Sequence, residues 1–144
     1  MTPPRAWFRA VWFVHRALRR VSGGRLGTRT PTADRVGMLF LHTVGRKSGQ
    51  PRVNGLFYLD DGSDLVAVAS NAGADRDPAW WLNLLDQPDA EVEIAGVRRP
   101  VRARAATAEE EVRLWPRLDA ANPDYAAYRA HAGRPIPIVI LEPR

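Results

Sequence analysis

The 144-residue chain contains no cysteine. This absence excludes disulfides, thiolate nucleophiles and cysteine-based zinc or iron–sulfur sites. The three histidines, His15, His42 and His131, are too far apart in the sequence to form a local metal motif. We therefore predict no metal site, and we expect any redox chemistry to come from an organic cofactor.

The sequence also lacks long apolar runs and the common catalytic motifs. No run reaches the roughly 18 residues that span a bilayer, and the first residues lack the plan of a signal peptide, so we expect a cytoplasmic protein. There is no G-x-S-x-G elbow, no P-loop and no H-E-x-x-H motif. Catalysis by side chains alone is therefore not expected.

Charge is distributed unevenly along what composition indicates is a single globular domain. Residues 1–52 carry ten arginines and Lys47 against Asp34 alone, a net charge of +10, whereas residues 53–144 carry ten arginines against fifteen acids, a net charge of −5. A cationic first third could serve nucleic acid, an anionic membrane or an anionic small ligand. Because no groove-reading motif is present, we expect no nucleic-acid partner.

The first segment is rich in arginine and aromatic residues. Residues 5–22 interleave the two in the pattern of a basic amphipathic helix, so we assign residues 1–30 to this helix and a linker, and residues 31–144 to the folded domain. Two interpretations remain open. Residues 5–20 could make a peripheral contact with the inner face of the cell membrane, or the helix could pack on its own domain.

A basic turn at residues 45–52 (GRKSGQPR) lies between two apolar runs, residues 36–44 and 53–59, that are typical of strands. Gly45 and Gly49 can adopt positive φ, which would let successive amides converge on an oxyanion. The turn also supplies three cations, Arg46, Lys47 and Arg52. It is therefore either a socket for a small polyanion or a solvated basic hairpin.

The rest of the chain predicts more short strands, joined by hairpins, and a few helices. We expect a hairpin turn at 60–64, strands at 65–70, 90–94, 97–107 and 136–141, a helix at 79–85 capped by Asp77, a helix opened by a capping box at Thr107 and Glu110, and a helical piece after Asn122 and Pro123. About six antiparallel strands with peripheral helices indicate a mainly β, α+β barrel.

Aromatic residues in the predicted helices allow two interpretations. Trp80 and Asn83 share one helix face, which would set a flat apolar wall beside an amide; alternatively, Trp80 and Trp81 fill the core. Tyr125 and Tyr128 lie one turn apart and could close over a pocket with their hydroxyls inward.

Four blocks occur in order: TVGRKSGQPRVN at 43–54, VASNAGA at 68–74, PAWWLNL at 78–84 and RPIPIV at 134–139. Together they resemble the deazaflavin-dependent nitroreductase family, the actinobacterial quinone and nitro-compound reductases that use reduced coenzyme F420. The resemblance implies a split β-barrel, flavin-reductase-like and similar to FMN-binding folds. It also implies hydride transfer from the reduced 8-hydroxy-5-deazaflavin to a quinone, nitro compound or similar conjugated acceptor.

The resemblance also implies roles for individual residues. Arg46, Lys47, Ser48 and Arg52 would bind the phosphate and oligoglutamate tail of the cofactor. The deazaflavin ring and ribityl chain would be lined by Val53, Asn54, Gly55, Leu56, Phe57, Val68, Ala69, Ser70, Asn71, Ala79, Trp80, Trp81, Leu82 and Asn83. Ser70 and Tyr125 would be catalytic, and Tyr125, Tyr128 and Trp80 would contact the substrate.

Some positions depart from the family pattern. Asn71 stands where relatives often have lysine, Gly55 where proline is usual, and Asn122 where the nitroreductase itself has an aromatic residue. We therefore favour a quinone over a nitro compound as acceptor. A competing hypothesis is a non-catalytic, membrane-associated binder of deazaflavin, haem or lipid, since related barrels hold varied ligands. Both a monomer and a homodimer are compatible with the sequence.

Overall fold

The computed structural model describes residues 28–144. The predicted N-terminal helix, including the proposed membrane contact at residues 5–20, lies outside the described residues. In the part of the chain that is described, no helix is both long enough and apolar enough to cross a membrane.

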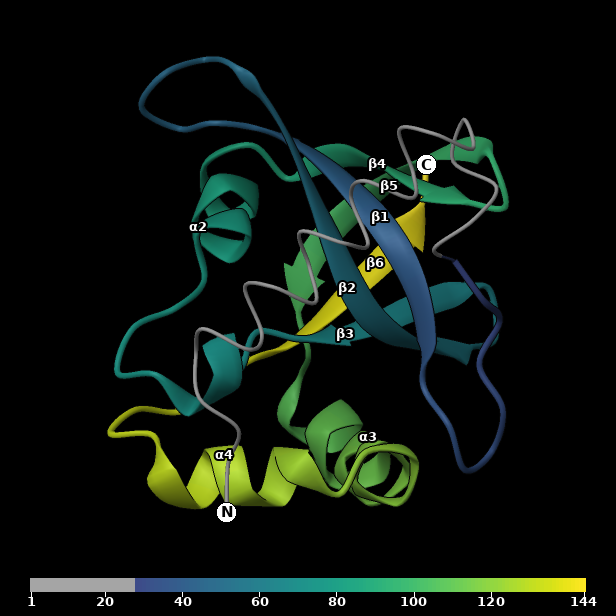
Figure 1. The fold of residues 1–144 in the computed structure, drawn as a ribbon, viewed down its shortest axis with the longest axis vertical. Coiled ribbons are helices and arrows are strands. Elements are labelled where there is room, and N and C mark those ends of the chain that lie inside the picture. The colour runs from purple at the N-terminus through teal and green to yellow at the C-terminus, as the bar shows by residue number, and fades with distance from the viewer. Residues whose placement is uncertain (1–27) are drawn as a thin grey trace.

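Six antiparallel strands form a closed barrel, which confirms the predicted fold class (Figure 1). Around the barrel the order is β1-β2-β3-β6-β5-β4, and β1 pairs with β4 to close it. The strands are β1 (Gly37–Val44), β2 (Pro51–Asp61), β3 (Asp64–Val68), β4 (Asp89–Ile94), β5 (Val97–Ala105) and β6 (Ile138–Pro143). Closure leaves the sheet without a free edge, and Pro137 immediately precedes β6, where it removes no hydrogen bond from the sheet.

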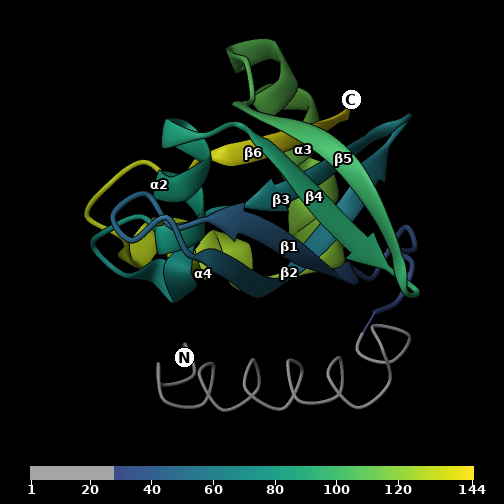
Figure 2. The ribbon, with the colours of Figure 1, turned by 90° about the horizontal axis from the view of Figure 1, so that it is seen from above.

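Within residues 28–144, three α-helices and one short 3-10 helix accompany the barrel. They are η1 (Asn71–Gly73), α2 (Ala79–Asp86), α3 (Ala108–Ala121) and α4 (Asp124–His131). Figure 2 shows α2 at one end of the barrel, while α3 and α4 lie across its outer surface. The hydrophobic core is accordingly divided: one cluster fills the barrel around Leu39, Leu41 and Val92, and a second lies between the barrel and α3 and α4 around Leu114 and Leu118.

The predicted cap of α2 is wrong by one residue. Pro78, not Asp77, occupies the N-cap position, and it provides no side-chain cap. The Asp77 carboxylate instead accepts a hydrogen bond from Arg134, 57 residues further along the chain, at 2.8 Å. A local capping rule cannot anticipate this partner, because the pairing depends on the tertiary fold.

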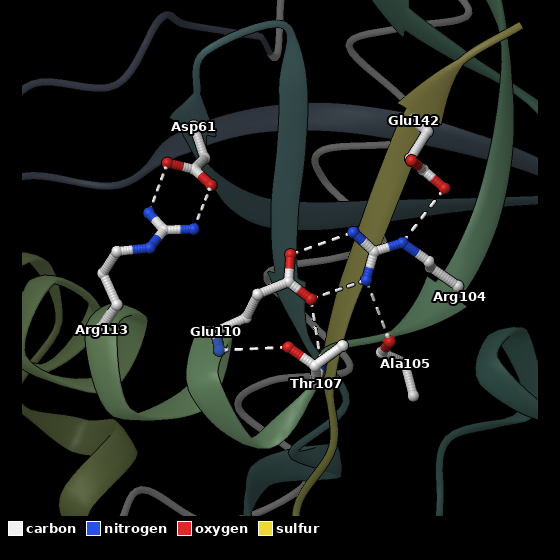
Figure 3. Close-up of polar contacts among 7 residues, drawn as sticks. All are labelled: Asp61, Arg104, Ala105, Thr107, Glu110, Arg113 and Glu142. Carbon is white, nitrogen blue, oxygen red and sulfur yellow. Dashed lines mark hydrogen bonds and ion pairs between the residues drawn. The ribbon is translucent and has the colours of Figure 1, made fainter.

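The predicted capping box at the start of α3 is confirmed and also ties the helix to the barrel (Figure 3). Glu110 donates its backbone N–H to the Thr107 hydroxyl, while its carboxylate accepts from the Thr107 amide. Both carboxylate oxygens also accept from Arg104 of β5, at 2.7 and 2.9 Å, and the Arg104 Nε donates to Glu142 of β6. One carboxylate therefore serves a helix cap and a contact between α3 and two strands.

Replacing Glu110 by glutamine should lower the free energy of unfolding by about 1–2 kcal/mol at neutral pH, because the charge-assisted contact with Arg104 is lost. Hydrogen bonds from Arg104 and Thr107 lower the pKa of Glu110 from 4.5 to about 2. A depressed folded-state pKa gives stability that is present above the unfolded value and is lost as the pH falls through the folded one. Urea titrations should therefore show the difference between wild type and variant shrinking from pH 4.5 towards pH 2; a difference unchanged across this range would contradict the assignment.

Candidate functional site

Three segments predicted to form the site lie on one flank of the barrel. They are the basic turn between β1 and β2, helix α2, and the loop at residues 69–77 that contains η1; both views place them on the same side (Figures 1 and 2). The turn and α2 are joined directly by hydrogen bonds. The fold thus brings together predicted site residues that are 37 positions apart, Arg46 and Asn83.

The backbone of the basic turn is held mostly by its own contacts. The Gly45 amide donates to the Gln50 carbonyl and the Gly49 amide to the Gly45 carbonyl, each at 2.8 Å. Gly49 has the expected positive φ of 68°, but Gly45 does not; Gly45 is needed because a Cβ there would lie 2.7 Å from the Ser48 Oγ. The Gln50 amide also bonds to the Ser48 hydroxyl. Since these three amides are used internally, they are not available for the expected convergence of amides on an oxyanion.

The cations of this turn differ from most other arginines of the domain. Arg46, Lys47 and Arg52 are exposed, and none of them forms an ion pair with a carboxylate within residues 28–144. Arginines that do pair with an acid are Arg98, Arg102, Arg104, Arg113, Arg117, Arg129, Arg134 and Arg144. The turn therefore presents positive charge that the described part of the protein does not neutralise, as a site for a polyanion requires.

Asn83 connects the basic turn to α2. Its Oδ1 accepts hydrogen bonds from both the backbone amide and the Nη1 of Arg46, at 3.1 and 3.2 Å, and its Nδ2 donates to the Thr43 hydroxyl at 3.3 Å. Arginine has only donors, so the amide oxygen must face it. The Asn83 side chain is buried, and most of its hydrogen-bonding capacity is used inside the protein. The structure therefore gives Asn83 a supporting position behind Arg46.

The loop at residues 69–77 has an unusual backbone. Asn71, Ala72 and Gly73 have φ values of 45°, 54° and 78°, so three consecutive residues are left-handed. The Asn71 side chain donates to the Arg76 carbonyl and so supports the loop internally. Ser70 is half-buried, and within residues 28–144 its hydroxyl has no hydrogen-bond partner. Ser70 is therefore free to contact a bound molecule.

The other residues predicted to line the ring do not form one surface. Trp80 and Trp81 are 7% and 4% exposed and belong to the cluster inside the barrel, which favours the core interpretation of this pair. On α2, Ala79 is exposed and Leu82 is half-buried.

Side chains alternate between the two faces of a strand, and this alternation places the remaining predicted ring-lining residues on different faces of the barrel. On β2, Leu56 belongs to the inner cluster whereas Phe57 packs against the outer one, and at the end of β3 Val68 and Ala69 divide in the same way. Consecutive side chains of a strand point to opposite faces, so side chains at 53–57 cannot all contact one ring.

Tyr125 and Tyr128 lie edge to face, with ring centroids 6.4 Å apart, in the cluster beneath α3 and α4. They are only 4% and 3% exposed. Burial raises the pKa of Tyr125 far above its ordinary value, although a side-chain hydrogen bond with Asn122 acts in the opposite direction. Burial also raises the pKa of Tyr128 to about 12. Both phenols therefore stay protonated at neutral pH, and Tyr128 lies against Gly73 of the loop at 69–77.

The six-stranded antiparallel barrel belongs to the fold class of F420 reductases and flavin-reductase-like split barrels. The sequence model of the F420H(2)-dependent quinone reductase family matches residues 10–143, and the chain belongs to this family. An F420H(2)-dependent quinone reductase of Mycobacterium tuberculosis is 37% identical over 134 residues, which cover 91% of this chain and 89% of the relative. The protein is an F420H2-dependent oxidoreductase, and its cofactor is coenzyme F420.

Two solved structures share the fold, and one of them is an F420-H2 dependent reductase. The F420-H2 dependent reductase FDR-A is 30% identical, with a TM-score of 0.66 over 73% of this chain and 93% of that one. A protein described as a domain-swapped dimer is 27% identical, with a TM-score of 0.68 over 97% of this chain and all of that one. The predicted family and cofactor are confirmed; the roles of individual site residues stay predictions.

Proposed function

We propose that the acceptor is a quinone, and that nitro compounds and similar conjugated acceptors are poorer substrates of the same site. The family name and the mycobacterial relative support a quinone. Asn122, where the resemblance leads us to expect an aromatic residue, is a small polar residue whose side chain accepts from the Asp124 amide at the junction of α3 and α4. It adds no aromatic surface for a nitroaromatic ring.

The proposal for cofactor binding rests on the cations of the basic turn, which are exposed and form no ion pair with a carboxylate within residues 28–144. The phosphate and oligoglutamate tail of coenzyme F420 is a polyanion, which Arg46, Lys47 and Arg52 would hold by charge and hydrogen bonds. The chemistry of these side chains therefore fits the cofactor. Bound at this flank, the reduced deazaflavin supplies a hydride, because it is a two-electron donor.

Protein side chains would then position the acceptor and stabilise its charge. The Ser70 hydroxyl, which has no hydrogen-bond partner among residues 28–144, would donate a hydrogen bond to the acceptor oxygen on which negative charge develops. The predicted role of Tyr125 changes with its burial: we propose that Tyr125 and Tyr128 support the loop at 69–77 from behind. The core position of Trp80 suggests that it contributes at most a ring edge to the site.

Binding of oxidised F420, followed by fluorescence, tests this proposal. Replacing Lys47 by alanine should weaken binding about fivefold, the effect of one solvated charge pair. Lys47 is the appropriate position because it is exposed and has no hydrogen bond within residues 28–144, so its removal leaves the turn intact. Arg117→Ala is the control, because this exposed cation binds Asp61 at the opposite end of β2.

Turnover is then measured with the reduced cofactor and a naphthoquinone or a nitroaromatic compound. Faster turnover of the naphthoquinone supports the proposed acceptor, and faster turnover of the nitroaromatic would reverse it. Equal losses of affinity in Lys47→Ala and Arg117→Ala would show that general charge, not the turn, attracts the tail. Binding without turnover of any acceptor would favour the non-catalytic alternative.

A further inference from the structure

Arg134 makes an unusual set of contacts with the loop that carries Ser70. It lies between α4 and β6, and its side chain is only 12% exposed. Its Nε donates to the Ala74 carbonyl at 3.1 Å, and its Nη2 donates to the carbonyls of Ala69 and Ser70 at 3.2 and 3.1 Å. Its Nη1 pairs with the Asp77 carboxylate at 2.8 Å. One guanidinium thus contacts both ends and the middle of the loop at residues 69–77.

This loop needs support from outside. Its left-handed residues include Asn71 and Ala72, whose Cβ atoms make that conformation unfavourable, so the surrounding structure must impose it. The loop also rests on α4: a Cβ added at Gly73 would lie 3.4 Å from the Tyr128 Cα and 3.5 Å from its carbonyl oxygen. Arg134 and α4 therefore both support the loop.

We propose that Arg134 is a positioning residue that fixes Ser70 and the loop at 69–77 for hydride transfer; this inference rests on the proposed function. Arginine suits the position because its planar group carries five donors that point in different directions. A lysine would keep the charge opposite Asp77 but could not reach the three carbonyls together. Three of the four loop acceptors are backbone oxygens, so these contacts fix the backbone of the loop independently of its side chains.

The expected effect of an Arg134 substitution on kcat and KM follows from the separation between the basic turn and the loop at 69–77. The cofactor tail would be held by the basic turn, which Arg134 does not contact, and only the ring and ribityl chain would contact residues 68–71, so KM for reduced F420 should rise much less than kcat falls. Displacement of the loop would misplace the acceptor relative to the ring, and kcat should fall about tenfold or more. A loss of kcat much larger than the rise in KM separates positioning from general damage to the fold.

The test uses Arg134→Gln and Arg134→Lys, with Arg113→Gln as the matched control. Arg113 also forms a two-point contact with a carboxylate, that of Asp61, but at the far end of β2. Hydrogen exchange of the peptide covering residues 69–77 is measured without cofactor, and kcat and KM are measured with reduced F420 and a naphthoquinone. We expect faster exchange of this peptide in Arg134→Gln, lower kcat in both Arg134 variants, and neither effect in Arg113→Gln.

Unchanged exchange of the loop in Arg134→Gln, or the same loss of kcat in Arg113→Gln, would overturn the inference. If Arg134→Gln does not fold, Asp77→Asn removes the charged contact and leaves the three carbonyl contacts; kcat should then fall about threefold with unchanged KM. Wild-type protein that fails to oxidise reduced F420 would refute the proposed function, while the exchange data would still decide whether Arg134 holds the loop.

Discussion

Replacing Asn83 by leucine should raise the dissociation constant for coenzyme F420 about thirtyfold, equivalent to about 2 kcal/mol. Leucine has nearly the same size but no polar atoms, so the backbone amide and the Nη1 of Arg46 would both lose their acceptor. The Arg46 side chain would then no longer be directed by α2, and the turn would be free to adopt other conformations. The proposed tail site would lose one aligned cation and the order of its backbone.

Two further variants separate the contributions of Asn83. Thr43→Val removes the partner of the Asn83 Nδ2 but leaves the contact with Arg46, so affinity should change less than about threefold. Asn83→Asp retains an acceptor for Arg46 but places a negative charge beneath the turn, which should weaken binding of the anionic tail. Fluorescence titration gives the affinities, and circular dichroism confirms the fold. Wild-type affinity in Asn83→Leu would refute the supporting role.

The strand order around the basic turn could be predicted because its determinants are local. Apolar runs on both sides of the turn indicated β1 and β2, and the acidic hairpin at residues 60–64 indicated the next connection, which the structure forms between Asp61 and Asp64. The Thr107 and Glu110 capping box fixed the start of α3 for the same reason. In each case the residues that specify the element are within a few positions of one another.

The functional flank was less predictable because its contacts join distant segments. Asn83 was predicted to face the cofactor, yet its partner is Arg46, 37 residues away. Arg134 belongs to the block at 134–139 but had no predicted role. The loop oxygens that accept its hydrogen bonds lie about 60 residues earlier in the chain. Burial of Tyr125 likewise depends on how α3 and α4 pack on the barrel. Sequence patterns indicated which residues belong to the site, but not which of them contact a ligand and which hold other site residues in place.

Replacing Gly37 by alanine should destabilise the domain by about 3 kcal/mol, the upper part of the range for overpacking. A Cβ at this position would lie 2.7 Å from the Arg29 carbonyl oxygen, 2.8 Å from the Pro31 nitrogen and 2.7 Å from a ring carbon of Tyr58. Two of these atoms belong to the backbone and cannot move aside by a change of rotamer. The third belongs to a ring that is 2% exposed and fills the barrel interior.

The surrounding hydrogen bonds make relaxation at Gly37 costly. Arg29 and Met38 exchange two backbone hydrogen bonds, of 3.1 and 3.0 Å, which fix the segment before β1 against the barrel, and Gly37 pairs with Tyr58 across β1 and β2. Gly133→Ala is the control, since its nearest neighbour to an added Cβ is an Asp75 oxygen at 3.7 Å, an ordinary contact. Urea unfolding should show a large loss for Gly37→Ala and a change within about 0.5 kcal/mol for Gly133→Ala. Equal stability of the two variants would mean that the segment before β1 can move away from the barrel without loss.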